Sequence, residues 1–154
     1  RWVEKQLLPE RPAFIVHRLD KAACGLIIVA HSKKIAAYFS RLFADRKITK
    51  KYRARVTRKF PQQVSIDDKI DKKMALSHAK CIYYDPETDS SLITVEIETG
   101  RKHQIRIHLN SLGFPIIGDR LHGNIQLTSS LIAFNCPING EFQTFILPKQ
   151  FELD

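Results

Sequence analysis

The residues best suited to chemistry lie in the segment His17-Arg18-Leu19-Asp20, which is followed by Gly25 and an apolar run. A carboxylate that acts as a nucleophile must stay ionised while it is desolvated, which requires a cation or hydrogen-bond donors nearby. Arg18 lies two residues before Asp20, so in an extended segment both side chains point the same way. Asp20 is therefore the first candidate for a catalytic residue, and the alternative is an ordinary aspartate in a turn.

Two distant residues can complete a site around Asp20. Arg106 stays protonated and can pair with a carboxylate through two hydrogen bonds. Tyr52 offers a flat face on which a base can stack and a phenol that can transfer a proton. Taken alone, Tyr52 is also explained as a packed tyrosine whose hydroxyl reaches an edge of the core.

The charge balance indicates a polyanionic partner. The 154 residues include 25 Lys and Arg against 16 Asp and Glu, for a formal net charge of +9, and the sequence pI is about 9.6. A basic domain of this size can bind a phosphate backbone, because neutralising phosphates releases condensed counterions. A basic surface that serves only solubility is the alternative.

Several classes of protein and site are not indicated. No apolar run approaches the ~20 residues that a membrane helix needs, and the first residues lack the apolar core of a signal peptide. The histidines and carboxylates show no metal-binding motif, and no glycine-rich phosphate loop is present. We therefore expect no membrane association and no metal.

The three cysteines are widely spaced and odd in number: Cys24, Cys81 and Cys136. This usage indicates a reduced, cytoplasmic protein with buried thiols. Cys24 with a histidine base is an alternative nucleophile, but its apolar neighbours favour a buried thiol. The chain begins without a methionine and reads as a fragment of a longer protein.

Two strands are predicted on either side of Asp20. Residues 13–16 form a candidate short strand. The continuous apolar run 26–30 is typical of a strand covered on both faces. These predictions place Asp20 in a loop held between two core strands, where catalytic residues are often found.

A helix and a strand are predicted next. Ser32 is a good N-cap for a helix over residues 33–46, whose apolar face consists of Ile35, Phe39, Leu42 and Phe43. Period-two alternation predicts a strand over residues 49–57. Its apolar face holds Tyr52, Ala54 and Val56, and its basic face holds Lys51, Arg53 and Arg55.

The next regions contain less regular patterns. Residues 58–73 are predicted to be a connection without periodic structure. Residues 79–84 and 91–98 predict two strands of a hairpin around a turn at 85–89, with an inward face of Ile93, Val95 and Ile97. Near the end, residues 131–134 and 142–146 predict a second strand pair, joined through Pro137, Ile138, Asn139 and Gly140.

A helix is predicted between the two strand pairs. Thr99 can cap a helix that runs to Leu112, and Gly113 can end it in a left-handed conformation. The predicted buried stripe is Ile105, Leu109 and Leu112. The first turns contain Arg101, Lys102, His103 and Arg106. Cations at this end oppose the helix dipole unless something negative lies there, and this conflict indicates a functional site.

The motifs and their order resemble the RluA family of RNA pseudouridine synthases. The first motif is His17-Arg18-Leu19-Asp20 with Gly25, and Lys51-x-Arg53-Ala54-x-Val56 follows after a helix. The second motif is Thr99-Gly100-Arg101-x-His103-Gln104-Ile105-Arg106-x-His108-Leu109, and Gly113-x-Pro115-Ile116-x-Gly118-Asp119 follows it. The order and spacing of these motifs agree over residues 14–146.

The resemblance implies an enzyme that isomerises uridine in rRNA or tRNA without a cofactor, detaching the uracil from C1′ and rejoining it through C5. It implies that Asp20 is the catalytic aspartate and that Arg106 pairs with it. Tyr52 would stack on the flipped base and help to remove the C5 proton, and Arg18 would take the place of the flipped base. The residues expected to bind RNA are Arg18, Lys51, Arg101, Lys102 and His103.

The resemblance also implies the fold of a pseudouridine synthase catalytic domain. This is an α+β fold with a mixed, mostly antiparallel sheet, at least two packed helices and a basic cleft across the sheet. Residues 1–154 would form one such domain, expected to be monomeric. It would lack the family's N-terminal segment, which carries a Lys-Pro-x-Gly motif, and any S4 RNA-binding domain.

The sequence departs from the family pattern inside the first motif and at two later places. Ala23-Cys24 stand where the family has Thr-Ser, residues 125–129 replace a Leu-x-Leu-His-Ala segment, and Cys136-Pro137 replace a His-Pro. An RNA-binding module of the same fold without turnover is therefore the alternative. A basic nuclease is a further alternative that would need metal ligands not found here.

Overall fold

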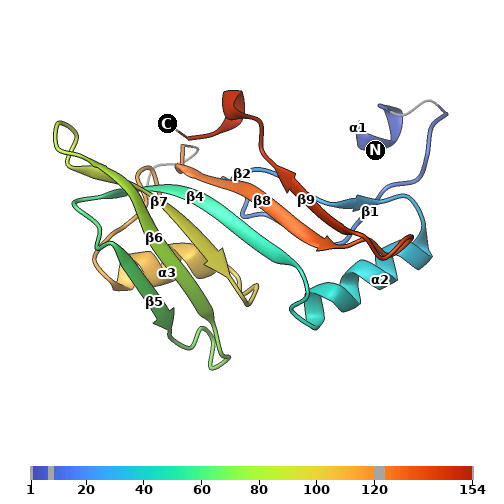
Figure 1. The fold of residues 1–154 in the computed structure, drawn as a ribbon, viewed down its shortest axis with the longest axis horizontal. Helices are drawn as coiled ribbons and strands as arrows, with labels where there is room; N and C mark the ends of the chain where they lie inside the picture. Colours follow the sequence, from blue (N-terminus) through green and yellow to red (C-terminus); the bar gives the residue numbers. More distant parts are fainter. Residues whose placement is uncertain (1, 7–8, 120–123, 154) are drawn as a thin grey trace.

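The computed structural model describes residues 2–6, 9–119 and 124–153 (Figure 1). The helices are α1 (Trp2–Lys5), α2 (Lys33–Ala44) and α3 (Gln104–Ser111), with a 3-10 turn at Lys149–Phe151. The strands are β1 (Phe14–Ile15), β2 (Cys24–Gly25), β3 (Val29–Ala30), β4 (Thr49–Thr57), β5 (Gln63–Asp67), β6 (Leu76–Asp85), β7 (Ser90–Ile97), β8 (Leu127–Asn135) and β9 (Phe142–Ile146).

Seven of these strands form one sheet in the order β2-β8-β4-β7-β6-β5, and β9 pairs with β8. The β2–β8 pair is parallel, and the other pairs are antiparallel. Strands β1 and β3 form a separate antiparallel pair. The predicted α+β fold with a mixed, mostly antiparallel sheet and packed helices is therefore confirmed.

Strand β4 lies at the centre of the sheet, between β7 and β8 (Figure 1). Its bounds and its alternation match the prediction: Tyr52, Ala54 and Val56 are buried, and the residues between them are only partly buried. The register with β8 shifts between Lys51 and Tyr52. Such a bulge bends a strand and changes the direction of a side chain, and bulges are frequent beside active sites.

Two hydrophobic clusters attach the helices to this sheet. Ile105 and Leu109 of α3 pack with the buried face of β4, including Tyr52. Phe39 and Leu42 of α2 pack with Ile132 and Phe134 of β8. The two helices therefore cover different parts of the sheet, because the apolar stripe of each fits a different group of strands.

Helix α2 follows the sequence prediction closely. The Ser32 side chain accepts a hydrogen bond from the Ile35 backbone N–H at 3.2 Å, as an N-cap should. The helix ends at Ala44, two residues before the predicted end, and Arg46 adopts a positive φ of 56°. This turn leads the chain directly into β4.

The apolar run after Gly25 differs from the prediction. It is not one continuous strand: β2 and β3 are short, and Ile27 between them is 48% exposed. Gly25 has a φ of +105°, and a Cβ there would overlap the Ser129 backbone. The close approach of these two backbones turns the chain from the large sheet toward the small one, so an unbroken strand cannot form.

Residues 58–73 also differ from the prediction, because they contain β5. Val64 and Ile66 alternate with exposed residues, and β5 pairs antiparallel with β6. Strand β6 begins at Leu76, ahead of the predicted start at 79, and β7 and the turn at 85–89 lie close to their predicted places. The short apolar alternation of β5 was obscured by the charged residues around it.

Helix α3 begins later than predicted. Thr99 is not its N-cap: the N-cap is His103, with a φ of 56°, and residues 100–103 form a loop. The Thr99 hydroxyl is used elsewhere, since it accepts from the Leu76 N–H at 3.0 Å and donates to Gln104 Oε1 at 2.6 Å. Thr99, which was predicted to be the N-cap, therefore connects α3 to β6 through these two hydrogen bonds.

The predicted end of α3 is confirmed, but its buried stripe is partly wrong. Gly113 has a φ of +83°, and the N–H groups of Gly113 and Phe114 donate to the carbonyls of Asn110 and Leu109. This pattern is a Schellman motif. Leu112, predicted to be buried, is 38% exposed, and His108 and Gln104 are buried instead.

The remaining predictions concern the C-terminal hairpin, the thiols and membrane spans. Strand β8 is longer than predicted, and β9 has the predicted bounds. All three cysteines are free, but Cys24 is exposed and the other two are only partly buried, so the prediction of buried thiols is wrong.

Among the described residues, no helix is long and apolar enough to cross a membrane.

Candidate active site

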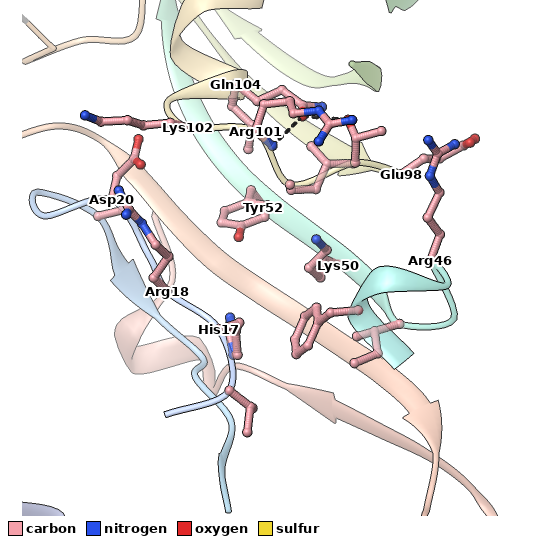
Figure 2. Close-up of a pocket in the computed structure, with 18 of the residues that line it drawn as sticks. His17, Arg18, Asp20, Arg46, Lys50, Tyr52, Glu98, Arg101, Lys102 and Gln104 are labelled. Carbon is pink, nitrogen blue, oxygen red and sulfur yellow. Dashed lines mark hydrogen bonds between the residues drawn. The ribbon is translucent and has the colours of Figure 1, made fainter. Parts of the chain in front are cut away.

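A cavity of about 540 Å³ lies across the central strand, within the range of roughly 300–1,000 Å³ typical of small-ligand sites. Three segments that are distant in the sequence line it (Figure 2). The loop after β1 contributes His17, Arg18 and Asp20; β4 contributes Lys50 and Tyr52; and the loop before α3 contributes Arg101, Lys102 and Gln104.

The loop that carries Asp20 is fixed at both ends. The Ala23 N–H donates to the Asp20 carbonyl at 2.9 Å, and the Leu26 N–H donates to the Ser129 carbonyl at 3.0 Å. Leu19 and Ala23 pack against the core that contains Tyr52. Because its neighbours are packed against the core in this way, the Asp20 side chain is held at the cavity wall with only 17% of its surface exposed.

Arg106 lies between two carboxylates. Its Nη1 is 3.8 Å from Asp20 Oδ2, which is an ion pair beyond hydrogen-bonding distance. Its Nε donates to Asp119 Oδ1 at 2.5 Å. The predicted pairing of Arg106 with Asp20 is thus seen as a loose ion pair, and Asp119, which sequence reasoning had not singled out, holds the guanidinium more closely.

The loop before α3 is held by Gln104, another residue that sequence reasoning had not singled out. Gln104 is buried, and its Oε1 accepts from the Arg101 N–H at 3.1 Å. Its Nε2 donates to the Leu76 carbonyl and to Ser77 Oγ. This network presents the Arg101 and Lys102 side chains to the cavity. His103 Nε2 lies 4.0 Å from Asp20 Oδ1.

Tyr52 lines the cavity on the same side of the sheet as α3, as the alternation of β4 requires. Burial and the nearby charge of Asp20 raise the pKa of Tyr52 to about 12. The side chain is therefore a neutral phenol at physiological pH. It can stack on a ring and donate a hydrogen bond, but it is not an ionised base.

Lys50 and His17 also line the cavity, and sequence reasoning assigned a role to neither. Burial lowers the pKa of Lys50. Burial, and to a lesser extent the charge of Lys50, lower the pKa of His17 to about 4. The signal for Lys50 was present, because residue 50 falls on the same face of the alternating strand as Tyr52.

Of the residues predicted to bind RNA, four reach the neighbourhood of Asp20. Arg18, Arg101 and Lys102 line the cavity, with Arg18 and Lys102 exposed at its rim, and His103 lies beside Asp20. Lys51 does not join them, because it projects from the other face of β4 and forms an ion pair with Glu96 at 3.3 Å. The RNA-binding roles of these residues stay predictions.

The arrangement supports chemistry on an anionic, ring-containing ligand. A half-enclosed carboxylate lies beside a guanidinium, a tyrosine provides a stacking face, and cations surround the opening. Within the ranges 2–6, 9–119 and 124–153, no group of three His, Cys, Asp or Glu side chains could hold a metal ion. The chemistry available from these side chains is proton transfer and stabilisation of charge on a bound ring.

Comparisons with known proteins agree with this reading. The family model described as RNA pseudouridylate synthase matches residues 3–111. The chain is 34% identical to an uncharacterized RNA pseudouridine synthase of Haemophilus influenzae, over 97% of this chain and 79% of that protein. It is also 34% identical to the ribosomal large subunit pseudouridine synthase D of Zymomonas mobilis, over 91% of this chain but 51% of the relative.

The chain therefore spans about half the length of the Zymomonas relative. Its fold is similar to the solved structure of human RNA Pseudouridylate Synthase Domain Containing 1, with a TM-score of 0.77 at 22% identity. This match covers 91% of the chain and 70% of the human protein.

Proposed function

The chain belongs to the RNA pseudouridylate synthase family, as its resemblance to the RluA family indicated, and we propose that it isomerises specific uridines of rRNA or tRNA to pseudouridine. The observation that supports this proposal best is the half-enclosed Asp20 carboxylate, in one cavity with Tyr52 and ion-paired with Arg106. A carboxylate in this setting can act at a ribose carbon while a ring lies on the tyrosine.

The reaction requires a nucleotide that has left its stack. Flipping a base out of a helix costs a few kcal/mol, which contacts elsewhere in the complex must offset. Arg18 extends from the Asp20 loop at the exposed rim, where it can occupy the space that the base leaves. Cations around the opening, with the net charge of +9, supply the contacts with phosphates.

The chemical steps balance without an added reagent. The N1–C1′ bond breaks and its electron pair stays on the uracil, while the Asp20 carboxylate compensates the positive charge that develops at C1′. The uracil turns and its C5 forms the new bond with C1′. C5 then loses its proton and N1 gains one, so the product is an isomer of the substrate.

Tyr52 takes part in these steps as a phenol. Since its pKa is raised to about 12, it can accept the C5 proton only if its own hydroxyl proton leaves at the same time. After burial, the charge of Asp20 is the second cause of this raised pKa, so we assign the Asp20 carboxylate as the acceptor of the hydroxyl proton. The Arg106 guanidinium, ion-paired with Asp20 at 3.8 Å, balances the negative charge of this carboxylate.

The test is conversion of uridine by the purified chain. Unmodified rRNA and tRNA transcripts carrying tritium at uridine C5 are incubated with wild type, with Asp20→Asn, and with Asp67→Asn as a control at an exposed position. We expect wild type and the control to release tritium and form pseudouridine, and Asp20→Asn to form none.

Binding without turnover is the alternative function. If wild type binds the transcripts yet forms no more pseudouridine than Asp20→Asn, the chain is an RNA-binding module and the proposed activity is wrong. Transcripts shortened by the protein in magnesium would instead indicate a nuclease.

A further inference from the structure

The side chain of Lys50 occupies an unusual place in the cavity. Its Nζ lies 5.5 Å from the centre of the Phe43 ring. On its other side is the loop before α3, where a Cβ at Gly100 would lie 3.5 Å from Nζ. Figure 2 shows Lys50 and Tyr52 projecting from β4 into the same pocket. The ammonium group is thus an inner part of the cavity, next to the stacking tyrosine.

This ammonium has no acidic partner among the residues that the structure describes. Within the part of the chain that the structure describes, the ion pairs of the cavity region join Asp20 with Arg106 and His103, and Glu98 with His78, and none includes Lys50. Burial lowers the pKa of Lys50, which shows that the protein disfavours its charged form. The nearby His17 is neutral and accepts a hydrogen bond from the Ile28 N–H.

Packing alone does not explain a lysine at position 50, because an apolar side chain would pack there at a lower cost in free energy. Phe43, Ile48 and Leu127 also line the cavity, and an apolar side chain at position 50 would avoid the cost of desolvating a charge. The charge is therefore explained best by a ligand that supplies the missing negative partner when it enters the cavity.

The position of Lys50 favours a base over a phosphate as that partner. The exposed cations Arg18, Arg46 and Lys102 lie at the rim, where a backbone phosphate remains in water. Lys50 is two residues from Tyr52 on one strand face, so both side chains can reach a single ring. A ring stacked on Tyr52 presents its edge, with its carbonyl oxygens, toward such a neighbour.

We propose that Lys50 is a catalytic residue whose ammonium group binds a carbonyl oxygen of the flipped uracil and stabilises the negative charge that forms on the ring. This inference rests on the proposed function. When the N1–C1′ bond breaks, both bonding electrons stay on the uracil and spread onto its carbonyl oxygens. The Lys50 N–H donates to one of these oxygens and keeps its proton. The contact strengthens as charge develops, so it accelerates the reaction more than it aids binding.

The test compares Lys50→Met, which keeps the length of the side chain without its charge, with Lys50→Arg, which keeps a charge. Lys47→Met, at an exposed position outside the cavity, is the matched control. Single-turnover rates are measured with saturating C5-tritiated rRNA and tRNA transcripts, and transcript Kd is measured at several salt concentrations. Thermal melting reports whether each variant folds.

We expect Lys50→Met to lower the saturating rate about 100- to 1,000-fold, as the loss of one preorganised donor does. Its transcript Kd and the salt dependence of that Kd should stay within about twofold of wild type, because a base contact releases no counterion. Lys50→Arg should regain at least about tenfold of the lost rate, and Lys47→Met should match wild type.

Other outcomes overturn the inference in distinguishable ways. A weaker Kd with a smaller salt slope and an unchanged rate would assign Lys50 to a phosphate. An unchanged rate and Kd, or failure of both Lys50 variants to fold, would leave it a structural residue. If wild type itself forms no pseudouridine, the proposed function is wrong, and the role proposed for Lys50 is wrong as well.

Discussion

The guanidinium of Arg106 is hydrogen-bonded through Nε to Asp119 Oδ1 at 2.5 Å. The Asp119 side chain is only 15% exposed, and its backbone N–H donates to the Ile116 carbonyl at 3.1 Å, so the carboxylate is firmly placed. Held in this way, Arg106 keeps Nη1 directed at Asp20, 3.8 Å from Oδ2. The position of the cation beside Asp20 therefore depends on a second carboxylate outside the main cavity.

Replacing Asp119 should disturb catalysis through Arg106. Asp119→Asn loses a charge-assisted hydrogen bond worth about 1.5–3 kcal/mol, so the saturating rate should fall about 10- to 100-fold. RNA affinity should stay nearly constant, since Asp119 faces Arg106 and not the rim. The measurement is single-turnover pseudouridine formation with a parallel Kd, and Asp67→Asn is the control. A wild-type rate in Asp119→Asn would show that Asp119 does not position Arg106.

Removing the hydroxyl of Tyr52 should separate binding from chemistry. Tyr52→Phe keeps the stacking face, so transcript Kd should stay within about twofold of wild type. It removes the route for the C5 proton, so the saturating rate should fall at least about 100-fold, in the range for loss of a general acid or base. A rate near that of wild type would limit Tyr52 to stacking, and a large rise in Kd would mean that the hydroxyl contributes to binding.

His17 should make the protein sensitive to mild acid. Its Nε2 accepts the Ile28 N–H at 2.8 Å, which requires the neutral ring, and its pKa is lowered from 6.5 to about 4. Between these values the unfolded chain binds a proton that the folded protein excludes, so stability falls as pH decreases from about 6.5 to 4. His17→Gln keeps an acceptor that does not titrate. Thermal melting between pH 7 and pH 4.5 should therefore show a decrease of a few degrees that this variant lacks. An equal decrease in both proteins would place the acid sensitivity elsewhere.

Two of the lysines that were predicted to bind RNA should differ in their effect on RNA affinity. Lys102 is exposed at the cavity rim, whereas Lys51 lies on the opposite face of β4 and pairs with Glu96. Lys102→Ala should weaken binding and reduce the salt slope of log K by about 0.7–0.9, the value for one phosphate contact. Lys51→Ala should change both quantities less. Equal effects would mean that the RNA also contacts the far face of the sheet.

Patterns with a clear period were sufficient to predict the elements that carry the site. The alternation over residues 49–57 gave β4 and the inward direction of Tyr52, and Ser32 gave the start of α2. The chemistry of the residue types and the family resemblance also grouped Asp20, Tyr52 and Arg106, which lie in one region of the structure. In these cases a local signal and the tertiary packing favour the same structure.

The failures occur where a long-range contact decides the local structure. Thr99 has the chemistry of an N-cap, but Leu76 and Gln104 use its hydroxyl, so α3 begins later. The run after Gly25 breaks because the chain must approach Ser129 and then reach another sheet. Asp119 could not be assigned to Arg106 from sequence, because no period relates a helix residue to a turn 13 positions later.

We propose that Asp20, in this cavity, enables the protein to convert uridines to pseudouridine in cellular RNA. The most direct measurement is a map of pseudouridines in the rRNA and tRNA of cells that lack the gene, complemented with wild type or with Asp20→Asn at equal protein levels. We predict that defined sites disappear on deletion, return with wild type and stay absent with Asp20→Asn. Restoration of those sites by Asp20→Asn, or an unchanged map after deletion, would contradict the claim.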